Sequence, residues 1–176
     1  MTTRYVFLAA ILLSVLAVGV YAWLGGFRPA AVALETTAAP VFLAGQAYAG
    51  SAQGDGFGPL FRRAKQVLDQ GRLPGAALAN LYYNNPETAH DTVRAFIGLA
   101  VADTLRPLPA GLRYRLVPAG QRVVAARIAG VSYLLSPNKL YPAALDLVNA
   151  QKLTPRNFYL ERFGPGETAE VWIGVK

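Results

Sequence analysis

Residues 78–101, LANLYYNNPETAHDTVRAFIGLAV, and residues 158–175, FYLERFGPGETAEVWIGV, decide the fold of this chain of 176 residues. Each stretch contains two apolar, strand-like runs around a turn, which reads NNPET in the first and GPGET in the second. Each also closes on an aromatic residue followed by Ile-Gly, at Phe96 and at Trp172. Matching turns and matching endings in the same order predict two copies of one β-hairpin.

A helix is predicted ahead of each hairpin. Apolar residues recur three and four positions apart from Phe57 to Leu68 and again from Leu140 to Val148, as on one face of a helix. Pro59 and Pro142 fall in the early turns that these patterns predict, where a missing amide donor costs little.

An extended segment precedes each helix, so the chain consists of two strand-helix-strand-strand units. We place the two units at residues 32–105 and 112–176, about 80 residues apart. Two such units that bury their helices on one side of their sheets form an α+β pseudodimer. The domain is therefore predicted over residues 29–176, with open strand faces available for a ligand.

The N-terminal segment is predicted to cross a membrane. The run from Val6 to Leu24 holds no charged residue, and its 19 positions at ~1.5 Å each nearly match the ~30 Å hydrocarbon layer. Residues 6–24 would then contact the lipid bilayer, and residues 1–28 would form the anchor and the start of a linker.

A cleavable secretory signal is the alternative for this segment. Arg4 would supply its basic start, and Val20-Tyr21-Ala22 its cleavage site. The length of the run and the aromatic residues Tyr21 and Trp23 favour an uncleaved signal-anchor. For a single-pass protein, Arg4 before the span against Arg28 after it favours a cytoplasmic N-terminus and an extracytoplasmic domain by about one charge.

Composition bears on several classes of partner. The chain has no cysteine, which excludes disulfides, thiolate metal sites and cysteine nucleophiles. Its net charge of +7 comes from scattered basic residues, and the densest group, Arg62-Arg63-Lys65, fits a solvated helix face. His90 is the only histidine and has no metal-binding or nucleophilic companion. We therefore expect no nucleic acid, no metal and no cofactor, and the sequence indicates no particular protein partner.

Two short motifs resemble a known family. Leu81–Pro86, LYYNNP, and Tyr159–Phe163, YLERF, are similar to a turn and a strand of the gyrase-inhibitory-protein-like (GyrI-like) domain, and the resemblance covers roughly residues 32–176. That domain binds small molecules in bacterial multidrug-responsive transcription activators and in free-standing proteins. The resemblance implies the same fold and a ligand pocket, and the predicted membrane span would make this chain a membrane-anchored member.

The resemblance also implies site residues. The family's acidic residue in the penultimate strand lies at the pocket floor, which here corresponds to Glu161, and aromatic residues supply stacking surface. Strand alternation places Tyr159, Glu161 and Phe163 on one face, and Glu170 and Trp172 share a face of the last strand. We expect the two carboxylates to converge on one concavity whose wall is completed by two further tyrosines, Tyr82 and Tyr48.

Such a site suits an aromatic or cationic amphipathic ligand, because a carboxylate and aromatic faces both attract flat cations. Three alternatives remain open. Glu161 could pair with Arg162 or Arg94 on a solvated sheet surface. Some members of the resembled family hydrolyse strained electrophiles, and Glu161 would then act as a general base beside Tyr82 or Tyr159, although a non-enzyme is the favoured expectation. The domain could also be a membrane-tethered protein-interaction module.

Overall fold

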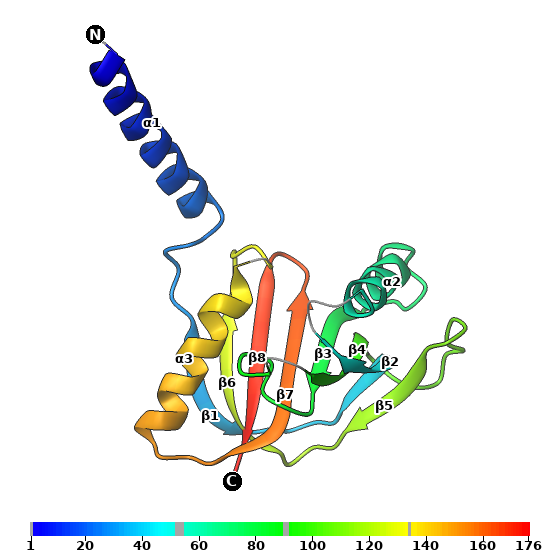
Figure 1. Cartoon of the computed structure of the whole chain (residues 1–176). Helices are drawn as coiled ribbons and strands as arrows, with labels where there is room; N and C mark the ends of the chain where they lie inside the picture. The colour runs from blue at the N-terminus through cyan, green and yellow to red at the C-terminus, as the bar shows by residue number, and fades with distance from the viewer. Residues whose placement is uncertain (1, 52–54, 90–91, 134) are drawn as a thin grey trace.

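The computed structural model describes residues 2–51, 55–89, 92–133 and 135–176, and it shows one helix that projects away from an α+β domain (Figure 1). The elements in chain order are α1 (Thr2–Trp23), β1 (Ala31–Thr36), β2 (Val41–Gly50), α2 (Phe57–Asp69), β3 (Ala77–Tyr82), β4 (Val93–Val101), β5 (Arg113–Val117), β6 (Arg122–Ile128), α3 (Ser136–Ala150), β7 (Pro155–Gly164) and β8 (Thr168–Val175). The predicted fold class is confirmed.

Eight strands form one antiparallel sheet in the order β1-β6-β8-β7-β3-β4-β2-β5. Exchanging the first unit (β1 to β4) with the second (β5 to β8) reproduces this order in reverse, as a pseudo-twofold axis between β3 and β7 requires. The predicted duplication is therefore visible in the sheet. The two predicted hairpins are β3–β4 and β7–β8.

Each unit also contributes a fourth strand at its start, which the strand-helix-strand-strand pattern did not include. β1 belongs to the first unit but pairs with β6 of the second, from Ala31 opposite Arg127 to Thr36 opposite Arg122. β5 of the second unit pairs in turn with β2 of the first. Each opening strand thus supplies hydrogen-bond partners to the outer strand of the other unit. This exchange depends on contacts between units, which a local sequence pattern does not contain.

Both domain helices cover the same face of the sheet, which we call the helix face. α3 packs on β6 and β8, and α2 packs on β2, β3 and β4. The central strands β7 and β3 therefore lie between the two helices in the sheet order. Pro142 is in the interior of α3, not in its first turn, because the helix begins four residues earlier than the apolar pattern indicated, at Ser136.

The opposite face, which we call the back face, has a core of its own. Leu81 from β3, Phe96 from β4, and Leu160 and Trp172 from β7 and β8 are buried there in one cluster. The central strands are consequently buried on both faces, whereas the pattern of one covered and one open face was the expectation.

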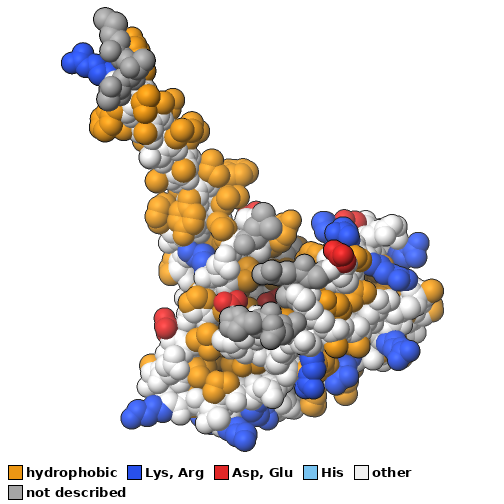
Figure 2. Space-filling model, in the orientation of Figure 1, with side chains coloured by type: hydrophobic (Ala, Val, Ile, Leu, Met, Phe, Trp, Pro, Cys, Tyr) orange, Lys and Arg blue, Asp and Glu red, His pale blue; other side chains and the backbone are white. Residues whose placement is uncertain are grey.

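α1 is long and apolar enough to span a membrane: its 22 residues measure about 33 Å along the axis. Its apolar side chains are exposed, and Figure 2 shows them along the side of the helix in view. The segment that follows is bound to the domain. The Leu24 carbonyl accepts a hydrogen bond from the Ser132 amide at 3.2 Å, the Arg28 guanidinium donates to the Ala129 carbonyl at 3.0 Å, and Lys139 donates to the Gly26 carbonyl.

Candidate functional site

Glu161 is a buried carboxylate at the centre of the sheet. It lies on β7, points to the helix face and is only 6% exposed. Three neutral donors hold it: Tyr141 Oη donates to Oε1 at 2.9 Å, and Tyr82 Oη and Asn80 Nδ2 each donate to Oε2 at 3.1 Å. We call Glu161 and these three partners the central site.

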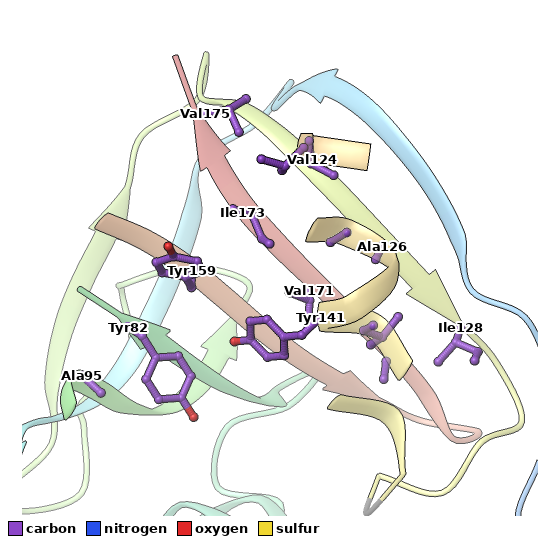
Figure 3. Close-up of a cluster of buried hydrophobic side chains, with 14 of the residues drawn as sticks. Tyr82, Ala95, Val124, Ala126, Ile128, Tyr141, Tyr159, Val171, Ile173 and Val175 are labelled. Carbon is purple, nitrogen blue, oxygen red and sulfur yellow. The ribbon is translucent and has the colours of Figure 1, made fainter. Parts of the chain in front are cut away.

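The sheet register brings the two units together at this point. Asn80 of β3 lies opposite Glu161 of β7, and Tyr82 lies opposite Tyr159, so all four side chains share the helix face. Tyr141 reaches the same place from α3. Figure 3 shows the Tyr82 ring on its strand and the Tyr141 ring on its helix.

Burial dominates the electrostatics of the central site. Removal from water raises the pKa of Glu161, the three hydrogen bonds lower it, and the nearby charge of Glu87 raises it further, so that the net pKa lies above the ordinary value. Burial also raises the pKa of Tyr82 and of Tyr141 well above that of a free tyrosine, and the Glu161 charge adds to both shifts.

Two features of the central site lack a partner. None of the ion pairs among the described residues involves Glu161. Its carboxylate therefore receives hydrogen bonds from neutral donors but has no positive charge paired with it. The Oδ1 atom of Asn80, a residue that is 3% exposed, has no hydrogen-bond partner in the described part of the chain. Turning the amide around would place the acceptor Oδ1 against the acceptor oxygens of the carboxylate. The hydrogen bond from Nδ2 to Glu161 therefore fixes Oδ1 in a position without a partner.

Most of the predicted aromatic residues lie on the helix face. Tyr82 contacts Glu161, Tyr159 is buried beside it, and Phe163 is partly buried against the same core. Tyr48 lies farther out, on β2, where its ring packs edge-on against Phe57 at 5.5 Å and its hydroxyl donates to the Ser51 carbonyl at 2.6 Å.

The predicted convergence of the two carboxylates was wrong. Glu161 lies opposite Val171, and Glu170 lies opposite Arg162, so alternation sends Glu170 and Trp172 to the back face. There the Glu170 carboxylate binds Arg162 and Arg127. The alternative in which Glu161 pairs with Arg162 or Arg94 on a solvated surface is also wrong, because Glu161 is buried and forms no ion pair with a described residue.

Sequence reasoning missed three residues that act on Glu161. Asn80 is a polar residue two positions before Tyr82, and strand alternation places it on the same buried face; that polar residue was the available signal. Tyr141 was assigned to the apolar stripe of its helix, where a hydroxyl is the only sign of a further role. Glu87 lies in the turn between β3 and β4 and acts on Glu161 through its charge.

The described residues contain no group of three or more His, Asp or Glu side chains placed to hold a metal ion. His90, which the sequence left without a role, lies outside the described residues.

No protein-family model and no curated protein matches this sequence. Several solved structures share the fold. An integron cassette protein from the mobile metagenome of Vibrio cholerae matches with a TM-score of 0.61 at 12% identity, over 85% of this chain and 97% of that one. The C-terminal domain of EcmrR matches with a TM-score of 0.56 at 15% identity, over 84% and 96%.

A third similar structure is SAV2435 bound to tetraphenylphosphonium, with a TM-score of 0.52 at 11% identity, over 85% of this chain and 94% of that one. These likenesses show a GyrI-like fold and agree with the resemblance in the two sequence motifs.

Proposed function

We propose that this protein is a membrane-anchored small-molecule-binding domain whose central site takes aromatic or cationic amphipathic ligands. The observation that carries the proposal is a buried carboxylate, Glu161, with three neutral donors and no described cation beside it. Burial of an ionised carboxylate is costly unless an opposite charge compensates it. A ligand cation would supply that charge.

The surroundings of Glu161 suit the rest of such a ligand. The rings of Tyr82, Tyr141 and Tyr159 lie in one buried cluster on the helix face, and aromatic faces attract cations. The open acceptor at Asn80 Oδ1 would receive a donor from the ligand. SAV2435, which shares the fold, is bound to a lipophilic aromatic cation.

Part of the loop between β3 and β4 lies near the central site. Ala89, in the loop between β3 and β4, packs against the core cluster that contains Tyr82 and Tyr141. Glu87 of the same loop is exposed, so an arriving cation meets this carboxylate before it reaches Glu161.

The membrane helix gives the ligand class a physical context. Amphipathic compounds concentrate in the bilayer, and a domain tethered by α1 stays beside that supply. The orientation carried by this proposal is a cytoplasmic N-terminus with the domain on the other side.

The test is a thermal-shift titration of the full chain in nonionic detergent with tetraphenylphosphonium. Ligand at about 100 times its Kd should stabilise the protein by about 2.7 kcal/mol, which raises Tm by several degrees. Glu161→Gln should weaken binding more than tenfold, whereas the matched back-face variant Glu170→Gln should bind like the wild type. Equal binding by wild type and Glu161→Gln would remove the central site from ligand recognition.

A second candidate function, hydrolysis of reactive small molecules, rests on the raised pKa of Glu161, which suits a general base. It predicts turnover of an electrophilic compound that Glu161→Gln abolishes while binding persists. If neither binding nor turnover is found, and a copurified protein is instead released by mutation of the domain, the interaction module would be the better assignment.

A further inference from the structure

A cavity of about 790 Å³ opens at the end of the sheet where β7 turns into β8. Its lining includes apolar residues, among them Val41, Phe42 and Ala100, and three charged residues, Arg127, Arg162 and Glu170. These charged side chains belong to the back face, so the cavity is separated from Glu161 by the sheet. Its volume is in the range of small-molecule sites, ~300–1,000 Å³.

Two of the three charged side chains of this back-face cavity, Glu170 and Arg127, already have hydrogen-bond partners within the protein. The Glu170 carboxylate accepts from Arg127 Nε at 2.7 Å and from Trp172 Nε1 at 2.6 Å through Oε1, and from Arg162 through Oε2. The two terminal nitrogens of Arg127 donate to Glu35. The hydrogen-bonding groups of Glu170 and Arg127 are thus occupied by each other and by neighbouring side chains.

Arg162 is the exception. One of its terminal nitrogens donates to Glu170, and no other hydrogen bond or ion pair with a described residue engages its remaining N–H groups. Its guanidinium lies 4.4 Å above the Trp172 ring and the side chain is 31% exposed. The ring therefore holds a planar guanidinium at the cavity wall, whose charge is felt by both Glu170 and Glu35 and whose remaining N–H groups are open to a ligand.

The position of the cavity relates it to the membrane helix. Pro29, Ala31 and Ala129 form part of its lining, and Arg28 binds the Ala129 carbonyl. Pro29 follows the last residue of α1, Trp23, by six residues, which reach at most about 20 Å when fully extended. The cavity is thus close to the point at which α1 leaves the domain.

We propose that this cavity is a second binding site, which takes a single-chain amphipathic carboxylate of the fatty-acid type. The carboxylate head accepts hydrogen bonds from the free N–H groups of Arg162, and the alkyl chain lies along Val41, Phe42 and Ala100. The site is independent of Glu161 in both position and charge preference. Only its supply from the bilayer rests on the proposed membrane anchoring.

Trp172 provides a direct readout, because Arg162 stacks on it. The chain has two tryptophans, so Trp23→Phe leaves Trp172 as the only one. The full-length Trp23→Phe protein in phosphatidylcholine nanodiscs is titrated with laurate below its micelle concentration. We expect a saturable change in Trp172 emission. Dodecyltrimethylammonium, which has the same chain length and the opposite charge, should give no saturable change.

Two variants test the assignment. Arg162→Gln should weaken laurate binding at least tenfold, and Ala100→Leu, which fills the apolar end and leaves the Arg162–Trp172 stack intact, should do the same. Glu161→Gln should leave laurate binding unchanged while it weakens binding of tetraphenylphosphonium more than tenfold, which separates this proposal from the central site. Far-UV circular dichroism checks that each variant is folded. Unchanged laurate affinity in Ala100→Leu, or an equal response to the cationic amphiphile, would overturn the proposal.

Discussion

Asn80 Nδ2 donates a hydrogen bond of 3.1 Å to Glu161 Oε2, and the two residues are 81 positions apart in the chain. Asn80 belongs to the first unit and Glu161 to the second, and they lie opposite one another where β3 pairs with β7. The central site is therefore built at the junction of the two units. A fold with a pseudo-twofold arrangement carries a site that is asymmetric, with one carboxylate.

Tyr141→Phe should destabilise the protein, because it removes the 2.9 Å hydrogen bond to a carboxylate that stays buried. We expect a loss of about 1–3 kcal/mol at pH 7 in urea unfolding of the full chain in detergent. Tyr159→Phe is the control, since the Tyr159 hydroxyl has no hydrogen-bond partner among the described residues, and it should cost less than about 0.5 kcal/mol. Equal losses in the two variants would contradict the role given to Tyr141.

The stability should depend on pH through Glu161. The folded-state pKa of Glu161 lies above the ordinary value of a glutamic acid, so between the unfolded and the folded pKa the native state binds more protons than the unfolded state. The contribution of Glu161 to the free energy of unfolding should therefore be largest below the unfolded pKa and decrease as pH rises through the folded pKa. The measurement is the difference in unfolding free energy between wild type and Glu161→Gln from pH 4 to pH 8. A difference that grows in favour of the wild type as pH rises would show the opposite sign.

Gly98→Ala should damage the sheet where β2 and β4 approach closely. Gly98 pairs with Gly45, and a Cβ atom at Gly98 would lie far inside van der Waals contact with the Ala44 backbone. We expect a loss of at least about 2 kcal/mol in thermal or urea unfolding. Gly58→Ala in α2 is the control: its Cβ meets only the flexible end of Arg62, at 3.3 Å, and alanine should stabilise the helix by up to about 1 kcal/mol.

The orientation in the membrane can be tested because the chain has no cysteine. Single cysteines introduced as Thr2→Cys and Lys176→Cys mark the two ends of the protein. With a cytoplasmic N-terminus, a membrane-impermeant maleimide should label Lys176→Cys in intact cells, and Thr2→Cys only after the cells are opened. The reverse pattern would place the domain in the cytoplasm, and release of the domain from washed membranes would indicate cleavage of the segment.

The parts of the fold that sequence reasoning predicted are those with a local period. These parts depend on residues that are neighbours in the chain. They are the apolar run of α1, the 3.6-residue period of α2 and α3, and the hairpins β3–β4 and β7–β8. The same argument predicted that Tyr159, Glu161 and Phe163 share a face, because alternation within one strand needs no knowledge of the other strands.

The rest depends on how distant segments meet. β1 and β5 exchange between units, and four-residue connections, residues 37–40 and 118–121, follow them, so the local pattern resembles an ordinary pair of strands. The faces of Glu161 and Glu170 are opposite because the register across the β7–β8 turn pairs Glu161 with Val171, and a shift of one residue would reverse every face.

The sequence by itself determined the apolar helix and the duplicated α+β domain, since these follow from composition and short-range periodicity, and its resemblance to the GyrI-like family pointed to the carboxylate of Glu161. Only the tertiary structure decided that Asn80, Tyr82 and Tyr141 enclose Glu161, and that Glu170 and Trp172 belong to a different cavity. The physical reason is that hydrogen bonding and burial at a site depend on the pairing of β3 with β7 and on the packing of α3, which join residues far apart in the chain.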